Sequence, residues 1–210
     1  MARPRAADHE EKKASILAVS AELIASEGYD RASMAMIGRR CGVSKALLYH
    51  YYDSKQALLF AILSEYLDFL RASLADIPEG LTPAKRLRAL VGALLAAYED
   101  ADAEHKVLIN DIALLPDALQ GEIRAREREI VAIFAEALSA LPWRDGQRER
   151  LLKPATMSLL GMLNWLYHWY RPGGGISRED YADLATSLMV GGVRGLSETQ
   201  ARAAPQEAEA

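Results

Sequence analysis

The sequence predicts an all-α protein built from an N-terminal helix-turn-helix domain and a C-terminal helical domain. Apolar residues recur at intervals of three and four along most of the 210 residues, which is the spacing of one helix face. Proline, glycine and capping residues separate these stretches. No stretch alternates as a strand does, and no internal repeat is present. We expect domains at residues 1–56 and 57–196, followed by a disordered tail at 197–210.

The composition favours a soluble cytoplasmic chain. Half of the residues are apolar and the formal net charge is −4, but no apolar run is long enough to cross a membrane. The amino terminus has no hydrophobic signal segment. The one cysteine, Cys41, cannot form an internal disulfide, which suits a reducing compartment or a cysteine that fills a small apolar space.

Three helices are expected at the N-terminal end. The first covers about residues 8–26, where Ile16, Val19 and Leu23 repeat at helical spacing. The second covers residues 33–41, and Gly42 follows it where a left-handed backbone is favoured. A third short helix follows directly. Two helices this short, joined through a glycine turn, indicate a helix-turn-helix motif.

Six further helices are expected in the rest of the chain. Asp53 with Gln56 resembles a capping box, Thr82 with Pro83 is a helix start, and Pro154 marks either a kink or a true first turn. The predicted ranges are 53–75, 82–98, 104–115, 116–138, 148–170 and 177–196. We expect the 53–75 helix to belong to both domains and to connect them.

The segment from Arg31 to Gln56 is basic within an acidic chain. It contains five basic residues and only one acidic residue, Asp53. Phosphate contacts dominate affinity for DNA, so a basic helix-turn-helix predicts a nucleic-acid surface. The alternative is that these are ordinary solvated helix charges. The surface of the second short helix is expected to carry residues Ser44, Lys45, Ala46, Leu47, Tyr49, His50 and Tyr51.

The N-terminal segment resembles the TetR family of transcriptional repressors over about residues 10–60. The residues that carry the resemblance are Gly28, Tyr29, Ser33, Ile37, Gly42, Val43, Ser44, Leu48, Tyr49, Tyr52, Ser54, Lys55, Ala57 and Leu58. The resemblance implies an all-helical homodimer with three helices for DNA and the remainder for a ligand pocket and a dimer interface. A two-fold dimer would place two recognition helices in successive major grooves of a palindromic operator.

The same resemblance implies roles at the DNA. Ser33, Tyr49 and Lys55 occupy the family's phosphate-contacting positions, and Ser44, Lys45, Ala46 and His50 occupy positions that face the groove. Leu47 departs from the small hydroxyl residue common in the family. It removes a hydrogen-bond donor, and we expect it to contact a thymine methyl group.

The last two helices are expected to be buried almost all round. Residues 157–170 are apolar or aromatic on nearly every side, and Gly191, Gly192 and Gly195 would let a partner helix approach closely. We interpret these helices as a homodimer interface. Polar residues within them are either satisfied groups at that seam or ligand contacts. The candidate ligand residues, with one from an earlier helix, are Asn110, Met157, Gly161, Asn164, Trp165 and His168.

The stretch from Trp165 to Gly174 is similar to TetR-family members that respond to acyl-coenzyme A thioesters of fatty-acyl, steroid-ring-derived and phenylacetyl types. The run 45–52 looks most like the phenylacetate-catabolism repressors. This resemblance implies an acyl-CoA inducer, of phenylacetyl or fatty-acyl type. The alternative is another hydrophobic small molecule, such as a drug or a free aromatic acid. No cofactor or metal is expected, and activation in place of repression stays open.

An enzyme is the main rival interpretation. The sequence has no zinc-protease, nucleophile-elbow or phosphate-loop motif, and its four histidines are scattered. A purely structural helical dimer would leave the basic segment unexplained. We therefore expect a regulator and not an enzyme.

Overall fold

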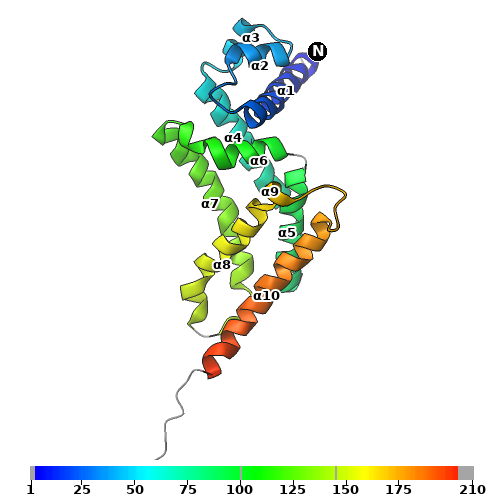
Figure 1. Ribbon diagram of the computed structural model, residues 1–210, viewed down its shortest axis with the longest axis vertical. Helices are drawn as coiled ribbons and strands as arrows, with labels where there is room; N and C mark the ends of the chain where they lie inside the picture. The colour runs from blue at the N-terminus through cyan, green and yellow to red at the C-terminus, as the bar shows by residue number, and fades with distance from the viewer. Residues whose placement is uncertain (1–2, 100, 145, 203–210) are drawn as a thin grey trace, which may run out of the picture. The chain divides into compact units, whose positions relative to one another are not determined.

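The structure is a computed structural model that describes residues 3–99, 101–144 and 146–202, with side chains only between residues 9 and 195 of those ranges (Figure 1). Its elements are α1 (Arg3–Glu27), α2 (Met34–Arg40), α3 (Lys45–Tyr51), α4 (Lys55–Ser73), α5 (Pro83–Glu99), α6 (Asp102–Asp111), the 3-10 turn η1 (Ile112–Leu114), α7 (Asp117–Ser139), α8 (Gln147–Asn164), α9 (Leu166–Trp169) and α10 (Arg178–Arg202). No strand occurs among the described residues. The all-α prediction is confirmed.

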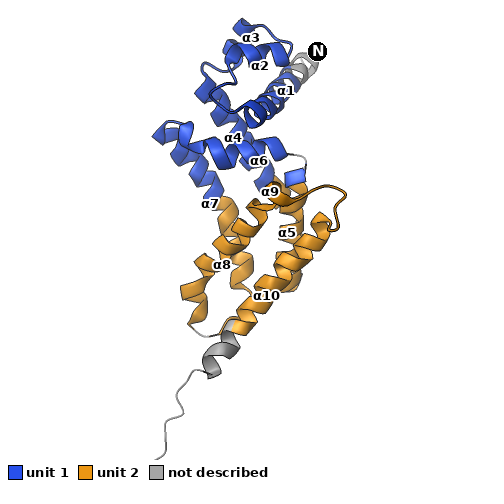
Figure 2. Cartoon of the chain, in the orientation of Figure 1, with its two compact units in different colours: residues 1–71, 98–128 blue, residues 72–97, 129–210 orange. Residues whose placement is uncertain are grey.

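The helices form two compact units that do not follow one linear boundary (Figure 2). One unit comprises residues 1–71 and 98–128, and the other comprises residues 72–97 and 129–210. All but the last residues of α4 therefore pack with the helix-turn-helix, together with α6 and the first half of α7. The functional boundary expected between residues 56 and 57 stays a prediction, because packing alone does not assign a role.

The core of the first unit holds α1 to α4 and α6 together. Ile16, Ile37 and Leu48 are completely buried and come from α1, α2 and α3 respectively. Burial of an aliphatic side chain of this size stabilises a fold by about 1.5–3 kcal/mol. Short helices are unstable alone, so this packing is what makes α2 and α3 possible. On the other side of α1, Lys106 Nζ of α6 donates to the carbonyl oxygen of Ala25 at 2.6 Å.

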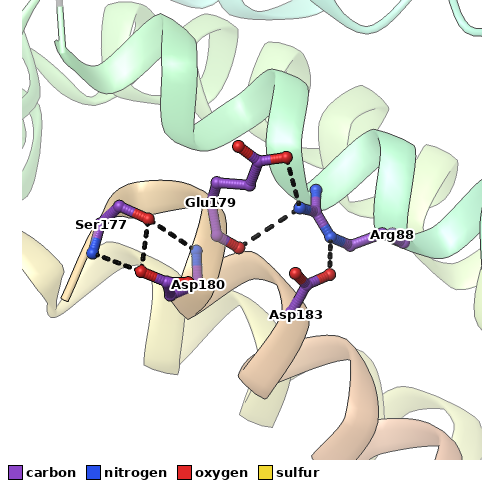
Figure 3. A network of polar contacts seen from close by, with 5 residues as sticks. All are labelled: Arg88, Ser177, Glu179, Asp180 and Asp183. Carbon is purple, nitrogen blue, oxygen red and sulfur yellow. Dashed lines mark hydrogen bonds and ion pairs between the residues drawn. The ribbon is translucent and has the colours of Figure 1, made fainter.

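The second unit packs α5, α7, α8, α9 and α10 around a separate core. Leu90 of α5, Phe134 of α7 and Leu163 of α8 are completely buried there. Arg88 of α5 also binds Asp183 and Glu179 at the start of α10 (Figure 3). These contacts fix the first turn of α10 against α5.

One expected helix cap differs from the structure, and another is present as expected. Ser54, not Asp53, is the N-cap of α4, because its Oγ accepts the Ala57 amide at 3.0 Å. At α10, by contrast, the expected cap is present. The Ser177 hydroxyl and amide donate to Asp180 Oδ2 at 2.6 and 2.9 Å, and the Asp180 amide donates to Ser177 Oγ at 3.0 Å (Figure 3). The 104–115 helix is α6 followed by η1.

The single helix predicted over residues 148–170 is wrong, because the structure divides it into α8 and α9. The Trp165 amide still bonds to the Gly161 carbonyl at 3.1 Å, but the Trp165 carbonyl accepts the amide of His168, only three residues on. This tighter turn shifts the helix register at Trp165. Pro154 lies inside α8 and does not begin it.

The predicted tail begins within the last helix. Residues 197–202 continue α10, and residues 203–210 lie outside the described part of the chain. Disorder of those last residues stays a prediction from composition.

Candidate DNA-binding surface and ligand-binding region

The turn between α2 and α3 is held by short backbone and side-chain contacts. Gly42 has φ of 65°, a conformation that favours glycine. The Val43 amide donates to the Gly38 carbonyl at 2.9 Å. A Cβ on Gly38 would lie 3.1 Å from the Val43 carbonyl oxygen, so a larger residue there would require the turn to shift by a few tenths of an ångström. These contacts fix the direction in which α3 leaves the turn.

Serine side chains cap both helices of the motif. Ser33 Oγ accepts the Met36 amide at 3.2 Å at the start of α2, and Ser44 Oγ accepts the Leu47 amide at 3.1 Å at the start of α3. Such a cap typically contributes about 1 kcal/mol to helix stability. A capping hydroxyl keeps its own proton, so both serines can still donate to a phosphate oxygen.

One face of α3 is exposed while the other is buried. Leu48 is completely buried against the first-unit core. Tyr49 keeps 40% of its surface exposed, and the Lys45 ammonium lies 5.7 Å from the centre of its ring. The other predicted surface residues of α3 and its cap are exposed too, namely Ser44, Lys45, Ala46, Leu47 and His50. Tyr51 is half-buried, and its ring lies 5.0 Å from the ring of His9 in α1.

Lys55 differs from the other predicted DNA residues because its ammonium already has protein partners. It donates to the carbonyl oxygen of Tyr29 and lies 4.0 Å from the centre of the Tyr29 ring. The Asp30 carbonyl oxygen is 3.5 Å away. Burial lowers the pKa of Lys55, and the nearby Asp30 opposes that shift. The side chain therefore ties the start of α4 to the loop after α1.

The candidate ligand residues occupy two places. Gly161, Trp165 and His168 are exposed residues at the α8–α9 junction, and Asn164 there is half-buried. The rings of Trp165 and His168 are in contact, tilted by 41° with centroids 3.9 Å apart, and Trp165 keeps 61% of its surface exposed. Met157 is exposed one turn earlier on α8. Asn110 lies in the other compact unit, where its amide donates to the Lys106 carbonyl at 2.8 Å.

Comparison with known families decides the identity of this fold. A family model described as "Bacterial regulatory proteins, tetR family" matches residues 16–62, which contain the helix-turn-helix. A second, described as "Tetracyclin repressor-like, C-terminal domain", matches residues 80–193. Together they cover most of the described chain. The chain belongs to the TetR family.

Individual TetR-family proteins are similar to this one over most of their length. A TetR-family transcriptional regulator from Bordetella parapertussis 12822 is 30% identical, with a TM-score of 0.77, and the match covers 85% of this chain and 93% of that one. The crystal structure of AibR in complex with isovaleryl coenzyme A and operator DNA has a TM-score of 0.72 at 28% identity, covering 84% and 97%. The repressor KstR2 of Rhodococcus jostii is 28% identical, covering 87% and 91%.

Membership of this family places the chain among transcription regulators, a non-enzymatic class. None of the helices that the structure describes is both long and apolar enough to cross a membrane. Within the described ranges, no group of three or more histidine, cysteine, aspartate or glutamate side chains is arranged to hold a metal ion.

Two residues that shape the candidate DNA-binding surface were given no structural role on the basis of the sequence. Tyr29 supplies both the carbonyl and the ring that hold Lys55. Gly38 allows the close approach of the turn. A glycine in the middle of a short predicted helix is a usable signal for such an approach. The partner of Lys55 has no local signal, because Tyr29 lies 26 residues earlier.

Proposed function

We propose that this TetR-family chain is a homodimeric repressor that binds a palindromic operator through residues 33–55. In this proposal an acyl-CoA thioester binds within residues 57–196 and releases the repressor from DNA. The observation that carries the DNA-binding half is the exposed face of α3, held by two capped helices and a glycine turn.

The residues of this face fit two kinds of DNA contact. Ser33 and Tyr49 carry exposed hydroxyl groups suited to phosphate oxygens, and Lys55 lies at the first residue of α4. Lys45 can donate to guanine acceptors in the major groove, while Ala46 and Leu47 can contact thymine methyl groups. Ser44 and His50 complete the proposed groove-facing set.

An uncovered apolar surface on the last helices supports the homodimer. Leu188 of α10 keeps 54% of its surface exposed, and Leu184 one turn earlier keeps 46%. A Cβ placed on Gly191 or Gly192 would meet no atom within 4 Å. A second copy of the chain could cover this surface, and an apolar patch that recurs on both copies suits a two-fold interface.

Similarity to a protein that binds both proposed ligands supports the acyl-CoA inducer. AibR has been crystallised with isovaleryl coenzyme A and operator DNA. In this chain Trp165 and His168 place two exposed rings in contact at the α8–α9 junction, an apolar indole beside a polar imidazole. Met157, Gly161 and Asn164 are the other proposed ligand residues of α8, and Asn110, which lies in the first unit, is proposed separately from the sequence. We propose that α4 transmits ligand binding to the recognition helix.

Operator release by defined thioesters tests the proposal. A duplex selected from a random library by the purified protein is titrated by fluorescence anisotropy, with phenylacetyl-CoA, isovaleryl-CoA or palmitoyl-CoA present. We expect one of them to lower operator affinity about 5- to 150-fold, and free coenzyme A to have no effect. Trp165→Ala should weaken this response while leaving DNA binding without ligand unchanged.

The possible results separate the two halves of the proposal. Release by free phenylacetate or by a hydrophobic drug, and not by thioesters, would favour the alternative ligand class. Failure to select any duplex at low salt would overturn the DNA-binding assignment itself.

Sedimentation velocity tests the homodimer. The wild-type chain should sediment as a dimer at micromolar concentration, and Leu188→Glu should shift it to a monomer because a charge would be buried at the seam. Lys85→Glu, an exposed change on α5, is the matched control and should leave the dimer intact. A monomeric wild-type chain would contradict the proposal.

A further inference from the structure

The first compact unit contains a hollow that the proposed function does not use. It has a volume of about 340 Å³, near the lower limit for small-molecule sites. Three helices line it, with small residues from α1 forming much of its apolar wall. The lining residues are Ala14, Leu17, Ala18, Ile62, Glu65, Tyr66, Phe69, Ala101 and Glu104.

Aromatic surface and negative charge meet in this hollow. Phe69 of α4 lines the hollow and keeps 43% of its surface exposed. The neighbouring Tyr66 is fixed, because its hydroxyl lies 2.9 Å from Nδ1 of the buried His105. The charged residues of the lining are Glu65 and Glu104, both acidic. The hollow therefore offers aromatic carbon and carboxylate oxygen, with no cation among its lining residues.

The two carboxylates are not equivalent. Glu65 forms an ion pair with Lys13 of α1, with 3.0 Å between Nζ and Oε1. Glu104 is half-buried and, among the described side chains, has no cationic partner within ion-pair distance. Burial raises the pKa of Glu104, and the nearby carboxylate of Glu22 raises it further. A positive charge placed in the hollow would relieve both effects.

We propose that this hollow is a binding site for a small organic cation that carries an apolar body, such as an alkylated ammonium. Aromatic faces attract quaternary and alkylated ammonium groups, and this attraction is strongest where water is partly excluded. Phe69 supplies the exposed aromatic surface, the buried Tyr66 lines the wall behind it, and Glu104 supplies the carboxylate that has no ion-pair partner among the described residues. An anionic thioester is excluded by the same carboxylates, so this site is distinct from the proposed inducer site.

Occupation of the site should stabilise the first unit, because a ligand that binds only the folded chain raises its melting temperature. The hollow lies between α1, α4 and the start of α6, the helices that support the recognition helix from behind. Thermal stabilisation therefore gives a readout that does not require DNA.

Calorimetric titration with benzyltrimethylammonium tests the proposal in the full chain without DNA. Neopentylbenzene, which has the same shape and no charge, is the ligand control. We expect Glu104→Gln to weaken binding of the cation about fivefold or more, and Phe69→Leu to weaken it about threefold. Glu122→Gln, an exposed change on α7, is the matched control and should not alter it.

The pH dependence provides a second readout that a folding defect would not mimic. Lowering the pH through the raised pKa of Glu104 should weaken cation binding to the wild-type chain and not to the Glu104→Gln variant. Circular dichroism melts confirm that each variant is folded. Equal affinity for the neutral isostere, unchanged affinity in Glu104→Gln, or no binding at millimolar cation would overturn the proposal. None of these outcomes bears on operator binding.

Discussion

The ammonium of Lys55 donates to the carbonyl oxygen of Tyr29 and lies 4.0 Å from the centre of the same residue's ring. This pair joins the first residue of α4 to the loop between α1 and α2. It also changes the expectation for Lys55, because an ammonium engaged with the protein has fewer protons to offer a phosphate. A structural role and a phosphate role can be measured separately.

Lys55→Met should reduce the free energy of unfolding by about 1 kcal/mol, because a charged hydrogen bond to a partly buried carbonyl is lost. Urea denaturation measures this, with the exposed Gln56→Ala as control. An unchanged midpoint would show that the Tyr29 contact does not stabilise the fold. The salt dependence of operator binding measures the other role: the slope should fall by about one if Lys55 also contacts a phosphate.

Lys45→Ala should weaken operator binding by about 1–3 kcal/mol and relax the preference at one base position. Lys45 is exposed at the first turn of α3, and Tyr49 restrains its ammonium from one side. Anisotropy titrations against the selected operator and its single-base variants measure both effects. Lys85→Ala on α5 removes a charge elsewhere and should change neither. Equal loss for every base variant would reassign Lys45 to a phosphate.

Tyr49→Phe should weaken binding to all duplexes alike, because the variant loses only a hydroxyl that we assign to a phosphate. The ring and its contact with Lys45 are retained, so the recognition surface keeps its shape. The expected loss is about 1 kcal/mol, the size of one hydrogen bond. Titrations with the operator and an unrelated duplex measure it. A loss confined to the operator would contradict the phosphate assignment.

The N-terminal helices could be predicted because their signals are local. Ser33, Gly42 and Ser44 specify the two short helices through contacts within three residues or through their own backbone. The α8–α9 break at Trp165 had no such signal, since neither proline nor glycine stands there. Apolar residues on nearly every side of this segment predicted one long helix. The register shift depends on tertiary packing, which the periodicity of the sequence does not encode.

The candidate site shows the same division between local and tertiary information. The exposed residues of α3 follow from helix periodicity once Leu48 is placed inward. The Tyr29 partner of Lys55 and the hollow beside Glu104 arise from residues far apart in the sequence. The sequence places the candidate ligand residues Gly161, Asn164 and His168 on one continuous helix over residues 148–170, which the structure divides into α8 and α9.

Arg88→Ala should lower the free energy of unfolding by about 1 kcal/mol or less, because its ion pairs with Asp183 and Glu179 are partly exposed. A double-mutant cycle with Asp183→Ala isolates the pair, with an expected coupling of about 0.5 kcal/mol. Gly92 permits this geometry, since a Cβ there would lie 2.7 Å from Arg88 Nη1. Additive single effects would mean that the ion pair contributes nothing.

Glu104→Gln should stabilise the chain at neutral pH. Burial raises the pKa of Glu104 above its ordinary 4.5, so the folded state holds this proton more tightly than the unfolded state does. Stability from this group is therefore present below pH 4.5 and is lost as the pH rises through the raised value. The neutral glutamine avoids that loss. The expected gain in free energy of unfolding is less than about 1 kcal/mol, because the site is partly solvated.

Thermal melts at several pH values measure this difference. The melting temperature of Glu104→Gln should exceed that of the wild-type chain at pH 7, and the gap should close as the pH approaches 4.5. The exposed Glu122→Gln controls for loss of one negative charge and should show no such convergence. Because a cation bound beside Glu104 would compensate its charge, benzyltrimethylammonium should narrow the gap at pH 7 by raising mainly the wild-type melting temperature. A difference in melting temperature that does not depend on pH would mean that the substitution acts through packing and not through charge.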